Sequence, residues 1–328
     1  MGGFSATLLI PLLGVIGHGI GFEWLAVVVI FVVVPFADRL LGKDWTNEVG
    51  IGAYSAGARA YLMALPALYV LTWIASLLWT AHTLSTVPLS AMQQGGLLMA
   101  AGIGSAFATC IAHELVHGHS PFEQMMCRTA LSVCWHGMFL LEHGHHHQTV
   151  GRVDIGGTPK LGESLWSFAP RCFVQGLRNC NEIERARNVR PWQHRIVQQV
   201  ALTIMIGGVF VGVGGWYGLA LFCWQGVFAI WVVETMTFIQ HYGLARRVDQ
   251  PISATQSWNR NNWLSNSLTF NMTRHSDHHR AGHVHYYELR RTGSAPQLPS
   301  DYFSLFLVAM VPPWWRWLMD DRARTAVL

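Results

Sequence analysis

The chain contains few charged side chains. Asp, Glu, Lys and Arg together make up 12% of its 328 residues, about half of the roughly 25% that is usual in a soluble domain. Apolar residues account for 51%, and tryptophan occurs 15 times. This composition excludes an ordinary soluble globular protein and indicates a chain that lies in lipid. Linkers, low-complexity segments and internal repeats are also missing, so we expect one membrane-embedded domain over residues 1–328.

Closely spaced cysteine pairs are absent as well. None of the six cysteines belongs to a Cys-x-x-Cys pair, which excludes a rubredoxin-type iron site, an iron–sulfur cluster or a thioredoxin motif of the usual spacing. We therefore expect no fused rubredoxin or ferredoxin domain, and any electrons that the protein uses must come from another molecule. We interpret the cysteines as small buried side chains; they are Cys110, Cys127, Cys134, Cys172, Cys180 and Cys223.

Six apolar stretches approach the roughly 20 residues that a helix needs to cross a bilayer. The first two are separated only by residues 18–21, His-Gly-Ile-Gly, which predicts a tight hairpin. The first stretch has neither the basic start nor a clear cleavage site of a signal peptide, so we expect it to be retained. The sequence thus predicts an all-α integral membrane protein with about six transmembrane helices, at about residues 5–20, 22–38, 61–81, 90–112, 199–216 and 218–240.

Lysine and arginine are missing from three of the connections between these stretches, near residues 18–22, 82–89 and 214–218. Basic residues gather in loops on the cytoplasmic side of a membrane. Six crossings that start in the cytoplasm place all 22 lysines and arginines on that side. We therefore predict a multi-pass protein of a bacterial-type inner membrane.

Nine of the 17 histidines form four short clusters just outside the apolar stretches. The clusters read HELVH, EHGHHH, QHYGL and RHSDHH, and the predicted topology places all of them on the cytoplasmic side. Neutral imidazole is the commonest protein ligand of iron, zinc and copper, and nine exceed the four ligands of a structural zinc site. The clusters predict two metal ions of five- or six-fold coordination, bound by His113, His117, His143, His146, His147, His241, His275, His278 and His279.

The spacing within the clusters supports this interpretation. His113 and His117 are one helical turn apart and share a face. The second and fourth clusters both have one histidine, two intervening residues and then an adjacent pair. Adjacent side chains on a helix diverge by about 100°, so an adjacent pair is able to reach two different ions, or one ion and a substrate.

Three carboxylates lie inside the clusters, and we expect them to accept hydrogen bonds from ligating imidazoles and fix their tautomers. They are Glu114, Glu142 and Asp277. Whether His145 or a carboxylate joins the metal ligands stays open. We interpret the remaining histidines as surface or supporting residues: His18, His82, His119, His136, His194, His283 and His285.

The four histidine strings resemble those of the membrane-bound alkane 1-monooxygenase family, which includes the xylene-type methyl hydroxylases. Two segments outside the metal site also look similar, Leu40-Leu41-Gly42-Lys43-Asp44 and Pro296-Gln297-Leu298-Pro299-Ser300. The resemblance covers roughly residues 30–320. Two features depart from the family pattern: the second cluster is one residue shorter, and Lys160 replaces an expected acidic residue after Thr158-Pro159.

The resemblance implies a six-helix membrane bundle with a cytoplasmic, nine-histidine di-iron cap. It implies O₂-dependent hydroxylation of a terminal methyl group of an alkane, alkyl chain or alkyl-aromatic, with electrons from rubredoxin or a ferredoxin-type reductase. Breaking such a C–H bond needs an oxidant that no side chain supplies, so the chemistry belongs to the cofactor. We expect an apolar substrate that enters from the bilayer, and no nucleic-acid partner. We also expect that Trp, Phe and Met side chains of the first four helices determine the length of the substrate channel.

Other functions fit parts of the pattern. A membrane fatty acyl desaturase uses similar histidine boxes, and the shortened second cluster resembles its spacing. HELVH also matches zinc metallopeptidases, which do not need seven further histidines. A metal transporter usually binds its cargo near the middle of the bilayer, whereas these clusters lie outside the apolar stretches. The basic face, which includes Arg185, Arg187, Arg190 and Arg195, is able to attract an acidic electron carrier.

Overall fold

The structure is a computed structural model that describes residues 2–44, 54–118, 120–155 and 157–327, and this part of the chain contains helices and loops but no strand. The predicted all-α fold class is confirmed. The α-helices are α1 Gly2–Ser5, α2 Leu13–Gly19, α3 Leu25–Val28, α4 Val34–Leu41, α5 Ala56–Thr86, α6 Ala91–Leu115, α7 Pro121–Val133, α8 Phe139–Thr149, α9 Leu165–Ala186, α10 Arg195–His241, α11 Trp263–Leu268, α12 His275–Arg280, α13 Tyr302–Ala309 and α14 Pro312–Val327. Short 3-10 helices are η1 Ala6–Leu12, η3 Pro191–Gln193, η4 Ala254–Gln256 and η5 Tyr286–Glu288, and η2 Val29–Val33 is a π-helical turn.

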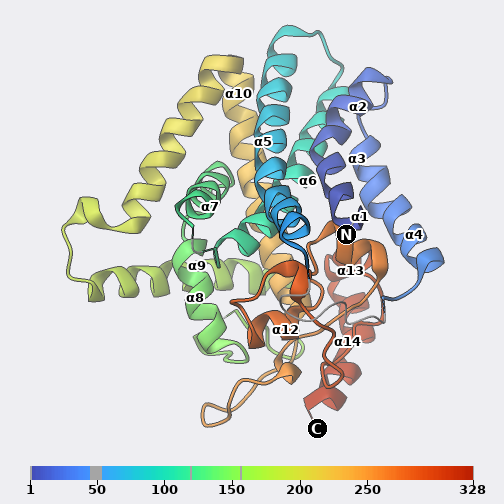
Figure 1. Ribbon diagram of the computed structural model, residues 1–328, viewed down its shortest axis with the longest axis vertical. Coiled ribbons are helices and arrows are strands. Elements are labelled where there is room, and N and C mark those ends of the chain that lie inside the picture. The colour runs from blue at the N-terminus through green and yellow to red at the C-terminus, as the bar shows by residue number, and fades with distance from the viewer. Residues whose placement is uncertain (1, 45–53, 119, 156, 328) are drawn as a thin grey trace.

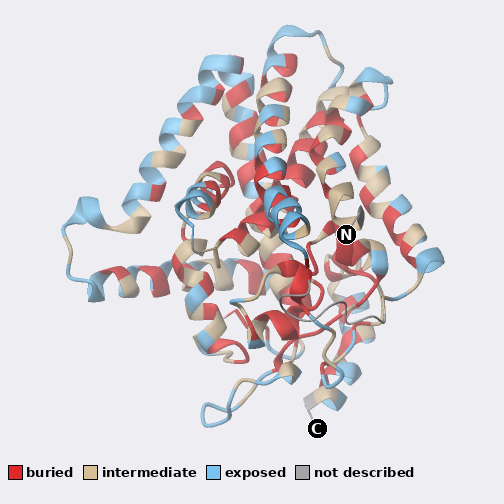
Figure 2. Ribbon diagram, viewed as in Figure 1, coloured by how far each residue is buried: buried red, intermediate tan, exposed pale blue. Residues whose placement is uncertain are grey.

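Three described helices, α5, α6 and α10, are long and apolar enough to cross a membrane. They pack against one another in the upper part of Figure 1, whereas α8, α12 and α14 lie below them. Side chains on the outside of the first half of α10 are apolar yet exposed, among them Ile204, Met205 and Trp216 at 68%, 64% and 83%. Figure 2 shows this exposure along the upper left edge of the molecule. An apolar surface of this kind is expected where lipid replaces water.

The two N-terminal apolar stretches form shorter, less regular helices than the sequence predicts. Pro11 has no backbone N–H to donate, and the chain around it follows the 3-10 segment η1. The second stretch passes through the π-helical turn η2 between α3 and α4. Six full-length crossings, and the side of the membrane on which each end lies, therefore stay predictions. The predicted hairpin at residues 18–21 is present, and the backbone N–H of Phe22 donates to Gly17 O across it at 2.7 Å.

Helix α10 reverses direction at Gly215, whose φ of 55° and ψ of −133° are open to glycine but strained for other residues. It therefore consists of two limbs, close to the two separate spans predicted at 199–216 and 218–240. The basic-free connections at the α2–α3 turn, the α5–α6 loop and this bend all lie at the top of Figure 1. The second limb of α10 and α6 both end toward the lower half of the molecule, where their terminal histidines meet α8 and α12.

The bend of α10 gives a testable stability difference between two glycines. A Cβ atom at Gly218 meets the backbone O of Phe210 at 2.0 Å, whereas a Cβ at Gly212 meets nothing within 4 Å. We expect Gly218→Ala to lower the free energy of unfolding by about 1–3 kcal/mol, as overpacking usually does. The matched Gly212→Ala is expected to be neutral or slightly stabilising, because alanine favours helix over glycine. Thermal unfolding of both variants in detergent measures the difference, and equal melting temperatures contradict the close approach of the two limbs.

Candidate metal centre

Eight of the nine predicted histidines converge in two groups of four. In each group one ring nitrogen per residue lies within 4.8 Å of the other three. The first group is His117, His143, His147 and His278; the second is His146, His241, His275 and His279. Residues that are 162 positions apart in the chain thus meet in one place below the long helices.

The two groups interlock through the short helices α8 and α12. On α8, His143 and His147 are one turn apart and enter the first group, while His146 enters the second. On α12 the assignment is reversed, because His275 and His279 enter the second group and His278 the first. Each adjacent pair is therefore divided between the groups, in agreement with the divergence of about 100° between neighbouring side chains on a helix.

Two long helices complete the groups. His117 follows the end of α6 and joins the first group, whereas His241 is the last residue of α10 and joins the second. The ring of His113 lies beside the first group, with its centroid 4.3 Å from those of both His143 and His278. Nδ1 of His113 is buried without a hydrogen-bond partner among the described residues, but His113 belongs to neither group of four.

The spacing of the ring nitrogens fits metal ions better than hydrogen bonds. Nε2 of His143 lies 2.8 Å from Nε2 of His117 and 3.0 Å from Nε2 of His147, which is also 2.9 Å from Nε2 of His278. A neutral imidazole has a single N–H, so three such contacts among four nitrogens cannot all be good hydrogen bonds. Nitrogens that bind one ion at about 2.1 Å and at right angles lie about 3.0 Å apart. In the second group, His275 Nε2 is 3.1 Å from that of His241 and 3.0 Å from that of His279.

Protonation also suits metal binding. Burial, reinforced by neighbouring imidazoles, lowers the pKa of His143, His146, His275, His278 and His279 well below the usual value for histidine, and burial lowers that of His147 to about 4. These rings are therefore neutral and keep the lone pair that a metal ion needs. The tautomer of His241 is fixed by the backbone, since its Nδ1 donates to Gln256 O at 2.8 Å and leaves Nε2 facing the second group.

The three carboxylates do not contact the clustered imidazoles as we expected. Asp277 accepts from the Arg280 side chain and from the backbone N–H of Arg290 at 2.7 Å, because its place on α12 directs it away from the neighbouring histidines. Glu114 bonds Nδ1 of His285 at 3.2 Å, and this hydrogen bond raises the pKa of His285. Neither acid has a hydrogen bond to a clustered imidazole among the described residues, so their tautomer-fixing role stays a prediction, and His285 has a definite carboxylate partner.

Glu142 lines a cavity and has no hydrogen bond to any of the nine histidines in the part of the chain that the structure describes. Its depth in the protein raises its pKa to about 7. The tautomer-fixing role of Glu142 thus also stays a prediction. His145, which we left out of the ligand set, lies outside both groups and faces the Asn179 side chain at 3.4 Å.

The two segments of family-like sequence outside the clusters brace α12. Asp44, at the end of the first segment, pairs with Arg274 at 2.6 Å, immediately before His275. In the second segment, Pro296 O and the N–H of Leu298 bond the backbone of Asn259 at 2.8 and 2.9 Å. The side chain of Asn259 in turn accepts from Ser276 N at 2.9 Å. Both segments therefore hold the helix that carries the fourth histidine cluster.

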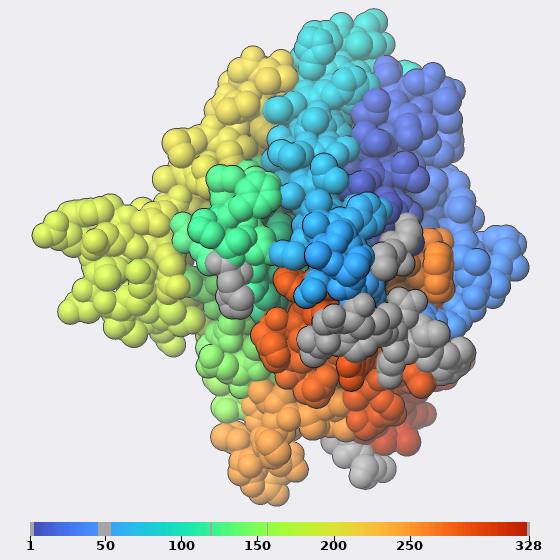
Figure 3. Space-filling view, viewed as in Figure 1, coloured from blue at the N-terminus to red at the C-terminus, as the bar shows by residue number. Residues whose placement is uncertain are grey.

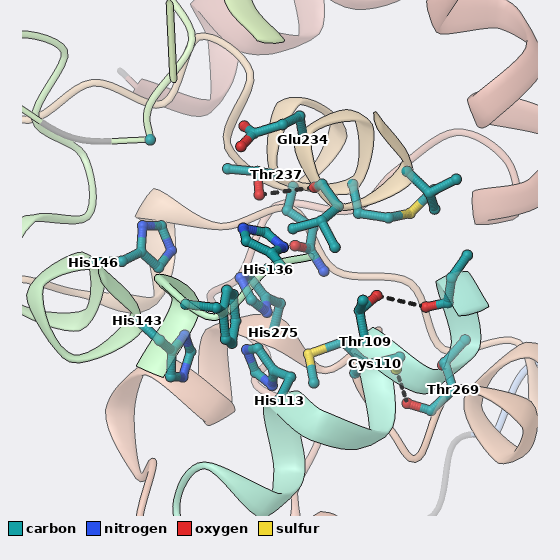
Figure 4. Close-up of a pocket in the computed structure, with 18 of the residues that line it drawn as sticks. Thr109, Cys110, His113, His136, His143, His146, Glu234, Thr237, Thr269 and His275 are labelled. Carbon is teal, nitrogen blue, oxygen red and sulfur yellow. Dashed lines mark hydrogen bonds between the residues drawn. The ribbon is translucent and has the colours of Figure 1, made fainter. Parts of the chain in front are cut away.

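A cavity of about 160 Å³ lies between the histidines and the long helices. Its walls come from α6, α8, the second limb of α10 and α13, and most of them are apolar. Figure 4 shows His113, His143, His146 and His275 gathered at one end, with Glu234 away from them. Of the two roles that we considered for His136, the surface position is wrong, because it is 2% exposed and lines this cavity. A lone histidine in a loop carries no spacing signal that predicts such a position.

Two of the four arginines that we assigned to the basic face form ion pairs within the protein, so fewer of them are available to a partner than the sequence suggests. Arg187 and Arg195 both bond the carboxylate of Glu184, at 2.8 and 2.7 Å, and Glu184 is fully buried. Arg185 and Arg190 remain exposed. Lys160, one of the two departures from the family pattern, is also exposed.

Comparison with known proteins agrees with this site. The model of the fatty acid desaturase family matches residues 88–309, the span that contains all four clusters. Alkane 1-monooxygenase 2 of Alcanivorax borkumensis is 30% identical, over 92% of this chain and 82% of the relative. Alkane 1-monooxygenase of Ectopseudomonas oleovorans is also 30% identical, over 93% and 79%. The xylene/toluene monooxygenase hydroxylase component XylM of Pseudomonas putida is 30% identical over 67% of this chain and 62% of the relative. The chain therefore belongs to the alkane 1-monooxygenase family, within the wider fatty acid desaturase family, and is a membrane monooxygenase.

Proposed function

We propose that the protein hydroxylates a terminal methyl group of an apolar substrate at a di-iron centre held by the nine clustered histidines. The observation that carries this proposal is the convergence of two four-histidine groups at one end of an apolar cavity. The overall reaction consumes the methyl compound, O₂, two electrons and two protons, and it yields the primary alcohol and water. We further propose that residues 1–328 act as one membrane-embedded domain with this centre on the cytoplasmic side.

The nine imidazoles suit two iron ions. The first group together with His113 offers five nitrogens and the second group four, which leaves positions open for exchangeable ligands on ions of five- or six-fold coordination. When bound, the irons supply the activation of O₂ and the oxidising power that the C–H bond requires. All eight grouped residues are histidines, so the two groups offer neutral nitrogen ligands and no carboxylate. This ligand set distinguishes the site from carboxylate-rich iron sites.

The chain's own residues orient the centre and exclude water from it. The ring of Phe139 stacks on that of His143, 4.8 Å between centroids and 17° between planes. Phe107 and Phe303 stack across the cavity wall with centroids 6.0 Å apart. A mostly apolar wall limits side reactions with water and positions a hydrocarbon by shape, which determines the carbon that reacts.

Electrons come from a separate redox protein in this proposal, of the rubredoxin or ferredoxin-reductase type, since none of the six cysteines lies in a Cys-x-x-Cys pair. A docking site on the cytoplasmic face places the donor on the same side as the histidines. Of the four arginines that we considered, Arg185 and Arg190 are free of Glu184 and remain candidates for attracting an acidic carrier.

Product analysis under ¹⁸O₂ tests the proposed function. We expect the iron-loaded protein in lipid, with an electron donor and a linear alkane, to form a primary alcohol that carries one ¹⁸O atom. The match to the fatty acid desaturase model makes desaturation the second candidate. An alkene without ¹⁸O, formed with the same consumption of O₂, contradicts hydroxylation and supports desaturation.

A further inference from the structure

A second hollow lies beside the metal-side cavity, between the two limbs of α10, α9 and the turn that follows α7. It has a volume of about 510 Å³ and no charged lining residue. Its two polar side chains, Gln199 and Thr203, are occupied, because Ser132 Oγ donates to Gln199 Oε1 at 2.6 Å and Thr203 Oγ1 donates to Ser132 O at 3.0 Å. The hollow is therefore suited to an apolar occupant.

The hollow opens toward lipid. Val200, Ile204 and Val211 line it, yet their side chains are 52%, 68% and 44% exposed. They lie on the first limb of α10, within a helix that is long and apolar enough to cross a membrane. Figure 3 shows this limb and α9, in yellow and yellow-green, standing out from the body of the molecule. In a bilayer, acyl chains would lie against the outer wall of the hollow.

A four-residue turn, 135–138, separates the hollow from the metal-side cavity. Trp135 and Gly137 line the hollow, His136 lines the cavity, and Met138 lines both. Trp135 has a φ of 60°, a strained value for a bulky residue. Met138 is therefore the side chain that stands between the two spaces. Methionine is flexible and adapts its shape readily, so this part of the shared wall is able to move.

We propose that this hollow is an entry chamber, through which an unbranched hydrocarbon chain passes from the bilayer, past Met138, to the metal-side cavity. The inference rests on the proposed function, because it takes the occupant to be the substrate. The wall that the hollow shares with the cavity at Met138, its lack of charge and its exposed apolar side chains favour a hydrocarbon chain over a protein segment. The terminal methyl group that enters first is then the one that reaches the histidines.

Two glycines on the first limb provide a matched test. An added Cβ has nothing within 4 Å at either Gly208 or Gly212, but only Gly208 of the two lines the hollow. We expect Gly208→Phe to lower kcat/KM for a linear alkane by at least about 10-fold, since misplaced substrates cost up to 100-fold, with metal content and melting temperature unchanged. Gly212→Phe is expected to stay within about twofold of the parent enzyme, because surface changes away from a site have small effects. Equal activities of the two variants overturn the proposal.

Labelling tests the chamber independently of turnover. A diazirine-bearing alkane, photolysed with the unaltered protein in lipid vesicles, is expected to label peptides from residues 196–211 and 219–223, and excess unlabelled alkane is expected to compete. Labelling confined to other lipid-facing helices, or labelling that alkane does not reduce, overturns the entry chamber even if Gly208→Phe fails to fold. Absence of any oxygenated product from the unaltered enzyme instead refutes the proposed function, so the two failures are distinguishable.

Discussion

Replacing one histidine in each group, as His278→Ala or His241→Ala, is expected to lower bound iron from about two to about one per chain and to reduce hydroxylation by at least about 100-fold. Changes to residues that merely support a ligand cost about 10–100-fold, and these two offer their own ring nitrogens to the first and second group. The two variants report on different ions, because His278 and His241 belong to different groups. Iron analysis and turnover of the purified proteins measure both effects.

A suitable control removes a histidine that belongs to neither group. His82 is exposed on α5, away from the clusters, and we expect His82→Ala to retain iron and activity. If His278→Ala and His241→Ala keep two irons and normal turnover, the grouped nitrogens are not the ligands. If each loses all iron, the two sites bind cooperatively but the ligand assignment stands.

Replacing Asp44, whose carboxylate pairs with Arg274, is expected to lower the free energy of unfolding more than any other substitution that we propose. The Arg274 side chain is 3% exposed and lies 2.6 Å from the Asp44 carboxylate, which is itself 17% exposed. Removing one member of a buried ion pair usually costs about 3–5 kcal/mol, so we expect Asp44→Ala to lower the free energy of unfolding by about 3 kcal/mol. Because Arg274 precedes His275 directly, we also expect weaker iron binding in the second group.

The control for this variant is an ion pair of the same kind in water. Asp249 pairs with Arg247 at 3.1 Å, and the two side chains are 67% and 78% exposed. Exposed pairs contribute about 0–1 kcal/mol, so Asp249→Ala is expected to change little. Melting temperatures and iron content of the two variants in detergent measure the contrast. An Asp44→Ala protein as stable and as iron-rich as Asp249→Ala contradicts the bracing role of the Asp44–Arg274 pair.

The division of histidines between two groups was predictable from the sequence because it depends on local geometry. Once α8 and α12 are helical, the angle between adjacent side chains sends His146 and His147, and likewise His278 and His279, in different directions. The break near residue 217 was also predictable within a few residues, because glycines occur where the two apolar stretches meet, and the structure places it at Gly215.

Contacts between residues that only tertiary packing brings together could not be predicted from the sequence. Asp277 is close to imidazoles in sequence, yet Arg280 and the backbone of Arg290 approach it in the fold. His136 has no clustered neighbour that identifies it, and its place on the cavity wall depends on how the loop after α7 packs. Asp44 and Arg274 are 230 positions apart, so their pairing requires the complete fold.

The central claim is that the two histidine groups hold a di-iron centre, and Mössbauer spectroscopy of ⁵⁷Fe-enriched protein, combined with iron analysis, tests it most directly. We predict about two irons per chain, with spectra that change when O₂ is added to the reduced protein and return on reduction. Stoichiometric zinc, or gently solubilised and folded protein that binds no iron tightly, contradicts the di-iron assignment.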